Sequence, residues 1–354
     1  MKTRTLCGFG VLTIVSALPW ASLNGAESSG AKAYSVVTTA KVGGAGGYDY
    51  VSADSDNRRL YIPRGNRVTI FDLDSLKSVG EIADTKAVHG VAVDPQSHHG
   101  FSSSKPVVMW DTKTLATIKS IDVEGSPDGI FFEKTTEHIY VLSHRAPNVT
   151  VIDAKEGAVV GTIDLGGAPE QAASDGEGHV FIDVEDKDNV AVVDAKTLKV
   201  TGHYALEGKG GTPAGLAIDA KNKLLFVCCR NPATCVVLNA KNGAIVATLP
   251  IGAGTDGAVF NSKTMEAFSS QRDGTLTIIK ESSPTRIEVE QNLATKLGAK
   301  TCTLDPKTNR VLLIAAEYGP PPAPAPGAAA GGAGGRPARG EMVADSFSVL
   351  VVGR

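Results

Sequence analysis

The chain has 354 residues, of which 42% are hydrophobic and 21% are charged, and its formal net charge at pH 7 is −3. This composition is typical of an ordinary globular protein and excludes a strongly basic one. Because nucleic acids and anionic membranes favour a basic patch on the protein that binds them, the near-neutral balance argues against both as partners.

The first 26 residues have the organisation of a secretory signal peptide. Lys2 and Arg4 precede an apolar run at 9–17, and small residues follow it. Such a run is too short to span a bilayer as a helix, and we expect cleavage after Ala26. No later segment reads as a membrane span. The sequence therefore predicts an exported protein, periplasmic or secreted.

From Tyr34 onward the chain repeats a unit of four short strands, which is clearest in Thr212–Ala253. Apolar runs such as GLAI, LLFVC, CVVL and AIVATL alternate there with turns rich in Asn, Asp, Gly and Pro, as expected of strands joined by tight turns. A polar marker closes the first strand of every unit: Asp54, Asp94, Glu133, Asp175, Asp219, Asn261 and Asp305. Successive markers lie 39 to 44 residues apart, which is the period of a propeller blade.

A second series of markers closes the third strands: Asp72, Asp111, Asp153, Asp194 and Asn239, with Lys280 as a degenerate member. The two series predict an all-β fold, a seven-bladed β-propeller of four-stranded antiparallel blades, in a single domain over 34–354. Blade six departs from the pattern at Lys280, which leaves only its turn in doubt.

The seventh unit is one strand short, with its strands expected near 299–304, 310–316 and 346–352. Tyr34–Gly44 copies the fourth-strand tails of the other units, so we expect it to complete the last blade and to remove an exposed sheet edge. Between the second and third strands of this blade, residues 319–342 are rich in Pro, Gly and Ala. That composition predicts a flexible loop inserted into a hairpin.

Four cysteines follow the signal peptide: Cys228, Cys229, Cys235 and Cys302. In an oxidising compartment, either Cys228 or Cys229 could bridge Cys235 across a hairpin of the fifth blade. Adjacent residues of a strand point to opposite faces, so only one of the two could join a given partner. The alternative, which we favour, is that these cysteines are mainly small buried apolar side chains with one disulfide at most.

The turns of such a meander leave on two faces of the disc. Turns after first and third strands are short and uniform, whereas those after second and fourth strands are irregular. Binding residues concentrate on variable loops held by a rigid scaffold, so we expect the irregular face to bind. It carries these candidate ligand-binding residues: Arg64, His144, Arg145, Arg230 and Arg272. A solvated rim is the alternative for each of them.

One position recurs at the start of every first strand, five residues before the marker. It holds Asp49, His89, Asp128, Glu170, Ala214, Asp256 and Lys300, and glycine follows it in four units. Because the first strand of a blade is innermost, these side chains should surround the mouth of the central channel. The six ionisable members, called the ring below, indicate a site for a cation, a metal such as Ca²⁺, Mg²⁺ or Zn²⁺, or a polyhydroxylated ligand. A hydrated channel is the alternative.

The repeats NVTVIDAKEGAVVGTIDLGG and NVAVVDAKTLKVTGHYAL and the ending SFSVLVVG resemble the YVTN-repeat β-propellers of the YncE-like family, which are exported bacterial proteins. The resemblance covers nearly all of 34–353 and implies a propeller and a binding or surface role. One relative is associated with single-stranded DNA. Binding of single-stranded DNA needs positively charged grooves and aromatic side chains that stack on the bases, whereas only 5% of the residues of this chain are aromatic.

We therefore expect an exported, monomeric, non-catalytic binding module. It would use the irregular face and the channel mouth to bind a small ligand, a cation or a protein partner. The alternative is a metal-dependent hydrolase of the lactonase type, which uses a similar propeller with an axial metal held by carboxylates. The absence of a complete catalytic constellation from the sequence favours the binding module.

Overall fold

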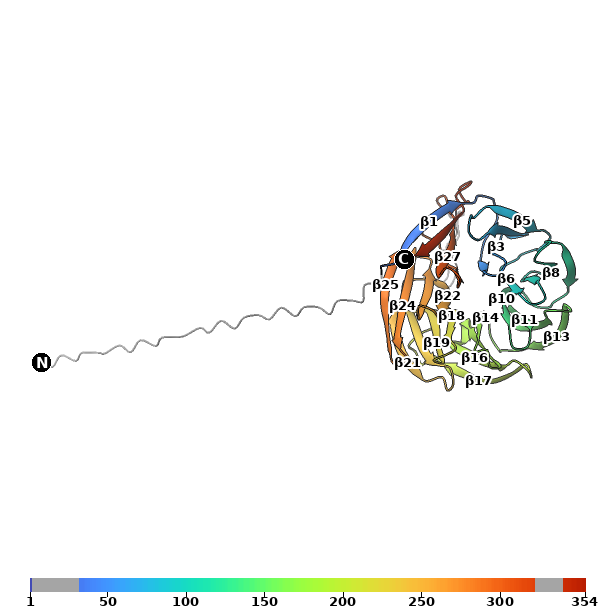
Figure 1. Cartoon of the computed structure of the whole chain (residues 1–354). Helices are drawn as coiled ribbons and strands as arrows, with labels where there is room; N and C mark the ends of the chain where they lie inside the picture. The colour runs from blue at the N-terminus through green and yellow to red at the C-terminus, as the bar shows by residue number, and fades with distance from the viewer. Residues whose placement is uncertain (2–31, 322–339) are drawn as a thin grey trace, which may run out of the picture. The chain divides into compact units, whose positions relative to one another are not determined.

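Seven four-stranded antiparallel sheets follow one another around a central axis, as the repeat predicts (Figure 1). The computed structural model describes residues 32–321 and 340–354 together with Met1. The rest of the predicted signal peptide and most of the predicted loop 319–342 lie outside these residues. Within the described part, no helix has the length and apolarity that crossing a membrane requires.

The first three blades follow the chain in order. Blade one contains β2 (Ser52–Asp54), β3 (Arg59–Pro63), β4 (Val68–Asp72) and β5 (Ser78–Ile82). Blade two contains β6 (Val91–Asp94), β7 (His99–Ser102), β8 (Val107–Asp111) and β9 (Thr117–Ile121). Blade three contains β10 (Pro127–Glu133), β11 (His138–Ser143), β12 (Val149–Asp153) and β13 (Ala158–Ile163).

The next three blades have the same order. Blade four contains β14 (Pro169–Ser174), β15 (His179–Val184), the short 3₁₀ helix η1 (Glu185–Lys187), β16 (Asn189–Asp194) and β17 (Lys199–Ala205). Blade five contains β18 (Pro213–Asp219), β19 (Leu224–Arg230), β20 (Ala233–Asn239) and β21 (Ile245–Pro250). Blade six contains β22 (Thr255–Asn261), β23 (Glu266–Gln271), β24 (Thr275–Ser283) and β25 (Arg286–Ala294).

Blade seven joins the two ends of the propeller. It contains β26 (Cys302–Asp305), β27 (Arg310–Ala315) and β28 (Ser348–Gly353), and its outer strand is β1 (Ser35–Lys41). Figure 1 shows β1, in blue, beside the red strands of the C-terminal end. The guanidinium of Arg354 lies 4.4 Å from the centre of the Tyr34 ring and forms ion pairs with Glu266 and Glu290. The predicted closure of the propeller by its N-terminal strand is therefore confirmed.

The polar markers, which reveal the repeat, cap the turns that follow them. The Asp111 carboxylate, for example, accepts the backbone N–H groups of Lys113 and Thr114 at 2.9 and 2.7 Å. Asp and Asn suit this role because their short side chains reach the backbone two and three residues ahead. At Lys280 this acceptor is missing, and β24 and β25 instead stay paired as far as Ser283 and Arg286. The turn of blade six therefore lies beyond Lys280, at the end of a longer hairpin.

The apolar core lies between neighbouring blades. One cluster, for instance, joins Val149 and Val151 of blade three to Val180 and Ile182 of blade four. The four cysteines among the described residues are buried and unbridged. Although Cys228 lies opposite Cys235 in the strand register, the structure places no disulfide there. Cys228 and Cys229 pack into different clusters, as the alternation of a strand requires.

The insertion 319–342 leaves blade seven from paired ends. The backbone N–H of Gly319 donates to the carbonyl of Glu341 at 2.8 Å, and that of Val343 donates to the carbonyl of Glu317 at 2.9 Å. These bonds extend the hairpin beyond β27 and β28, so the insertion starts from a defined point on the irregular face.

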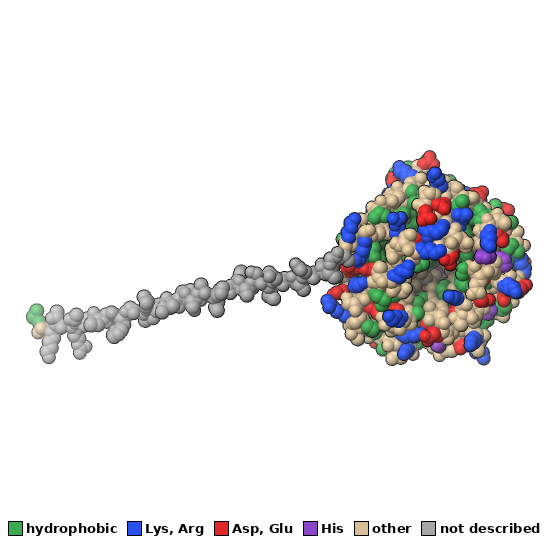
Figure 2. Space-filling model, viewed as in Figure 1, with side chains coloured by type: hydrophobic (Ala, Val, Ile, Leu, Met, Phe, Trp, Pro, Cys, Tyr) green, Lys and Arg blue, Asp and Glu red, His purple; other side chains and the backbone are tan. Residues whose placement is uncertain are grey.

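Basic and acidic side chains are interspersed over the face of the propeller that Figure 2 shows. Large exposed apolar residues occur on the outermost strands of several blades, including Val37, Val79, Ile118, Val159 and Val246. Such scattered residues are normal on a soluble surface. Because its charges are interspersed, the face in Figure 2 lacks the single-sign basic patch that nucleic-acid binding would favour.

Candidate functional site

The structure brings the ring together at the mouth of the central channel. All six members line one pocket of about 340 Å³ there: Asp49, His89, Asp128, Glu170, Asp256 and Lys300. Asp128, Glu170 and Asp256 are the second residues of β10, β14 and β22, and the other three lie just before innermost strands. The predicted convergence is thus what the structure shows. That these side chains bind a ligand remains a prediction.

The glycines that follow the ring allow the innermost strands to approach closely. A Cβ atom on Gly129 would lie 2.5 Å from the carbonyl oxygen of Glu170, and one on Gly215 would lie 3.0 Å from the carbonyl carbon of Gly257. Neither contact is sterically acceptable without movement of the backbone. The blades therefore hold the ring on a tightly packed frame.

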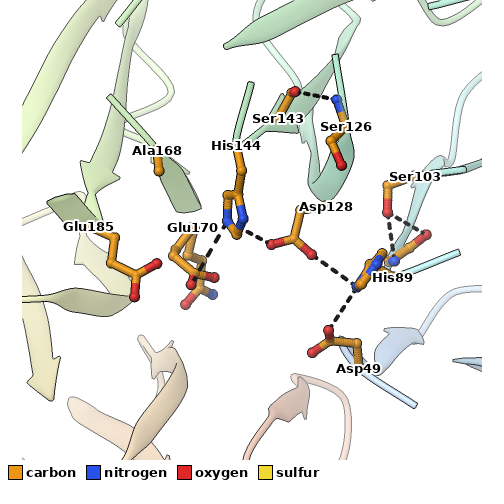
Figure 3. Close-up of polar contacts among 12 residues, drawn as sticks. Asp49, His89, Ser103, Ser126, Asp128, Ser143, His144, Ala168, Glu170 and Glu185 are labelled. Carbon is orange, nitrogen blue, oxygen red and sulfur yellow. Dashed lines mark hydrogen bonds and ion pairs between the residues drawn. The ribbon is translucent and has the colours of Figure 1, made fainter. Parts of the chain in front are cut away.

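Along one half of the pocket, members of the ring and His144 form a chain of alternating carboxylates and histidines, called the histidine half below (Figure 3). Asp128 lies at its centre, with Oδ1 3.0 Å from His89 Nδ1 and Oδ2 3.0 Å from Nε2 of His144. His89 Nδ1 also lies 2.9 Å from Asp49 Oδ2. The hydrogen bond to Asp49 raises the pKa of His89, and the hydrogen bond to Asp128 raises the pKa of His144.

The other half of the pocket contains an ion-pair network around Asp256, a member of the ring. Its carboxylate forms ion pairs with Lys300, Arg230 and Arg272. Burial disfavours the charged form of Asp256, but these three cations outweigh burial and hold its pKa well below the usual value. Lys300 Nζ also lies 2.6 Å from Asp49 Oδ1, which connects the network to the histidine half.

Glu170 belongs to both halves. Its Oε1 lies 4.0 Å from His144 Nε2 and 3.3 Å from Arg230 Nη2. Burial, followed by a hydrogen bond with Glu185, raises the pKa of Glu170 well above its usual value. Glu185 extends from η1 and lies 2.5 Å from Arg230 Nη1. Although Glu185 is on the irregular face, the sequence did not single it out as a site residue.

Three residues that the sequence pattern did not single out lie next to the ring, and one of them, Tyr50, lines the pocket. At the position after the ring, where four blades have glycine, the other three have Tyr50, Gln171 and Thr301. The Tyr50 hydroxyl crosses the channel from blade one and donates to Glu170 Oε2 at 2.7 Å. Gln171 Oε1 accepts the backbone N–H groups of Leu216 and Ala258 at 2.9 and 3.1 Å. The departure from glycine is the signal that would have identified them.

A second pocket, of about 950 Å³, opens at the other end of the channel. Gln171 lines this second pocket and Tyr50 lines the first, and the two pockets share no lining residue. Tyr50 and Gln171, at equivalent positions of blades one and four, thus face different pockets.

The residues predicted after second strands have different positions. His144 lines the pocket, and Arg230 and Arg272 contact its Asp256. Arg64 does not reach the pocket, because it is buried with its guanidinium 3.7 Å from the centre of the Phe347 ring and bonded to the carbonyl of Gly44 at 2.7 Å. The exposed Arg145 is not among the lining residues either.

A search of family models found none that matches the chain. Among curated proteins, the chain is 30% identical over 132 residues to the uncharacterized protein YncE of Escherichia coli O157:H7. That match covers 34% of this chain and 37% of YncE, so it spans just over a third of the relative.

Solved structures are similar over most of the chain. A chain in the crystal structure of the mitotic checkpoint complex has a TM-score of 0.68 at 12% identity, covering 86% of this chain and 95% of that one. A chain of the Kuenenia stuttgartiensis hydrazine synthase has a TM-score of 0.65 at 18% identity, covering 75% and 92%. At these identities the likeness shows the propeller fold alone.

Proposed function

Because the chain is a seven-bladed propeller similar to YncE, we propose that it is a non-catalytic binding module that takes a small polar ligand or a cation in the ring pocket. The observation that carries this proposal is a pocket of about 340 Å³ lined by ionisable side chains from six of the seven blades. Convergent polar groups on a rigid scaffold are typical of a binding site. A protein partner would bind over the irregular face that surrounds this pocket.

The charges around the pocket favour a ligand that brings positive charge or hydroxyl groups. Five carboxyl groups face three permanent cations, and their surplus is partly neutralised by protons, because the pKa values of Glu170 and of both histidines are raised. The carboxylates are Asp49, Asp128, Glu170, Glu185 and Asp256, and the cations are Arg230, Arg272 and Lys300. A metal cation would take the place of the protons that these groups hold.

The test fills the pocket without altering its charges. Ser126 is exposed and lines the ring pocket, so Ser126→Trp should obstruct it, while Ser262→Trp places the same bulk at the other end of the channel. Wild type and both variants are titrated calorimetrically with hydroxycarboxylates, sugars, polyamines and divalent metal chlorides. We expect at least one probe class to bind the wild type, about tenfold weaker binding or worse in Ser126→Trp, and unchanged binding in Ser262→Trp. Failure of every probe, or equal loss in both variants, would contradict the proposal.

Metal-dependent lactone hydrolysis is a second candidate. Two groups of possible metal ligands favour it: Asp49, His89 and Asp128, and Asp128, His144 and Glu170, each with its ligand atoms within 4.8 Å of one another. A metal held by such groups can activate water. Lactone hydrolysis is measured with Zn²⁺-supplemented and Mn²⁺-supplemented wild type and Asp128→Asn. Equal rates in the two proteins remove this candidate.

We also propose that the protein acts outside the cytoplasm, in the periplasm or after secretion. The support is the signal-peptide pattern of residues 1–26, which lie outside the described residues apart from Met1. Cell fractionation followed by mass spectrometry of the mature N-terminus tests this localisation. Full-length protein retained in the cytoplasm would contradict it.

A further inference from the structure

The histidine half of the ring points to a particular class of ligand. We infer that Asp49, His89 and Asp128 bind one divalent first-row transition-metal ion. This inference rests on the proposed function, because the ion would occupy the same pocket. The ion would be held by three ligand atoms from blades one, two and three, which the sheet framework fixes in place.

Two of the three distances between the ligand atoms already match those of metal ligands. Asp49 Oδ2 and Asp128 Oδ1 lie 2.9 and 3.0 Å from His89 Nδ1, and all three atoms lie within 4.8 Å of one another. Ligands bound at about 2.0–2.2 Å to a tetrahedral or octahedral ion are separated by roughly 3 Å. An ion could therefore be bound with little movement of these side chains.

Hydrogen bonding alone leaves this arrangement incomplete. His89 Nδ1 carries at most one hydrogen, yet two carboxylate oxygens lie within 3.0 Å of it. A metal ion at the point that the three atoms share would attract both oxygens and the ring nitrogen.

The carboxylates of Asp49 and Asp128 are each fixed by a second partner. Lys300 Nζ lies 2.6 Å from Asp49 Oδ1, and His144 Nε2 lies 3.0 Å from Asp128 Oδ2. In each case the other oxygen of the carboxylate is the one that faces His89. Outer partners of this kind orient the ligands of known metal sites. The His89 side chain is 41% exposed, so solvent can complete the coordination.

The neighbouring group, Asp128, His144 and Glu170, is less suitable. Glu170 Oε2 accepts a hydrogen bond from Tyr50 at 2.7 Å, and its Oε1 lies 3.3 Å from Arg230 and 4.0 Å from His144. Both Glu170 oxygens are thus engaged elsewhere. An imidazole ligand favours later transition-metal ions such as Zn²⁺ and Co²⁺ over Ca²⁺ and Mg²⁺, which prefer sites made of oxygen alone.

The experiment uses the tag-free chain, stripped of metal with EDTA and dialysed. Zn²⁺ and Co²⁺ are titrated calorimetrically, and Co²⁺ binding is also followed by visible absorption. We expect one equivalent to bind, and binding about 100-fold weaker in Asp49→Asn and Asp128→Asn. His179→Ala is the matched control, because His179 lies 2.8 Å from Asp175 but belongs to neither group of possible metal ligands among the described residues. It should bind like the wild type.

Absence of Zn²⁺ and Co²⁺ binding to the folded wild type would overturn the inference, as would equal loss in His179→Ala and Asp49→Asn. Should Asp128→Asn fail to fold, Asp49→Asn still decides, since the Asp49 side chain is only partly buried. If the metal-free protein binds an organic probe that Ser126→Trp excludes, while Zn²⁺ and Co²⁺ do not bind, only the metal inference is wrong. If neither metal nor organic probe binds, the proposed function is wrong as well.

Discussion

Tyr50 and Arg64 show what individual residues add to the propeller pattern. Tyr50 lines the ring pocket and connects blade one to the Glu170 carboxylate of blade four. Its pKa is raised well above the usual value, by burial first and then by nearby carboxylates. Tyr50 therefore remains a neutral hydrogen-bond donor at any ordinary pH, and it restrains a carboxylate that like charges surround.

Removal of this hydroxyl should be measurable. Tyr50→Phe leaves a buried acceptor with one partner fewer, which costs about 1–2 kcal/mol. Tyr61→Phe is the matched control, because the buried Tyr61 hydroxyl has no hydrogen-bond partner among the described residues. We expect Tyr61→Phe to leave the free energy of unfolding unchanged or slightly higher. Urea denaturation of both variants measures the difference, and equal effects would contradict the role assigned to Tyr50.

The sequence predicted the ring because its spacing to the turn markers is constant and the innermost strands share one axis. Spacing does not give the direction of a loop side chain. Arg64 follows the second strand of blade one and Arg230 ends that of blade five. Arg230 nevertheless meets Glu185 and Asp256, whereas Arg64 meets backbone carbonyls and Phe347. The difference depends on neighbouring blades, which a single repeat does not encode.

At the scale of strands and turns, the caps explain why the repeat is so easily recognised. Glu133 at the end of β10 is fully buried and accepts the backbone N–H groups of Thr135 and Thr136 at 3.0 and 2.8 Å. Burial disfavours its charge, but these hydrogen bonds outweigh burial and hold its pKa below the usual value. Glu133 thus performs with a longer side chain what Asp does in most other blades.

This shift predicts a dependence of stability on pH. Because the folded-state pKa of Glu133 is lower than its unfolded value of about 4.3, the carboxylate stabilises the fold above that pH. The contribution is lost as the pH falls through the folded-state pKa. Glu133→Gln should therefore cost about 1–2 kcal/mol at pH 7 and progressively less toward pH 3.

Urea midpoints between pH 7 and pH 3 provide the measurement. The control is Glu156→Gln, because the Glu156 side chain is 69% exposed and should change stability by less than about 0.5 kcal/mol. A cost for Glu133→Gln that stays constant over this pH range would contradict the prediction.

Strand existence was readable from the sequence, but the length of one hairpin was not. Lys280 cannot cap a turn as Asp does, so the sequence indicated a break there without indicating what replaces it. The structure shows pairing that continues to Ser283 and Arg286. The continuation depends on cross-strand contacts beyond the repeat, which a marker pattern does not contain.

For the molecule as a whole, the pairing of β1 with β28 decides whether the circle of blades is closed. Six residue pairs join the two strands, from Ser35↔Gly353 to Lys41↔Ser348. Without β1, the outer edge of β28 would expose its backbone groups to other chains. The copying of a fourth-strand tail in Tyr34–Gly44 made this closure predictable.

Deletion of residues 1–41 should therefore destabilise the propeller by on the order of 3 kcal/mol through lost cross-strand pairs. It should also produce oligomers or aggregates, which size-exclusion chromatography with light scattering detects. Deletion of residues 1–31 retains β1 and is the matched control, with an unchanged melting temperature. A monomeric 1–41 deletion that melts like this control would show that the closure contributes little.

The pocket that contains the ring and the pocket at the other end of the channel share no lining residue, so the two faces of the propeller present separate hollows. An occupant of the ring pocket would meet solvent at the irregular face, where the His144 side chain is 40% exposed. A partner seated on the irregular face would therefore cover that occupant, whereas one seated on the opposite face would contact a different set of residues.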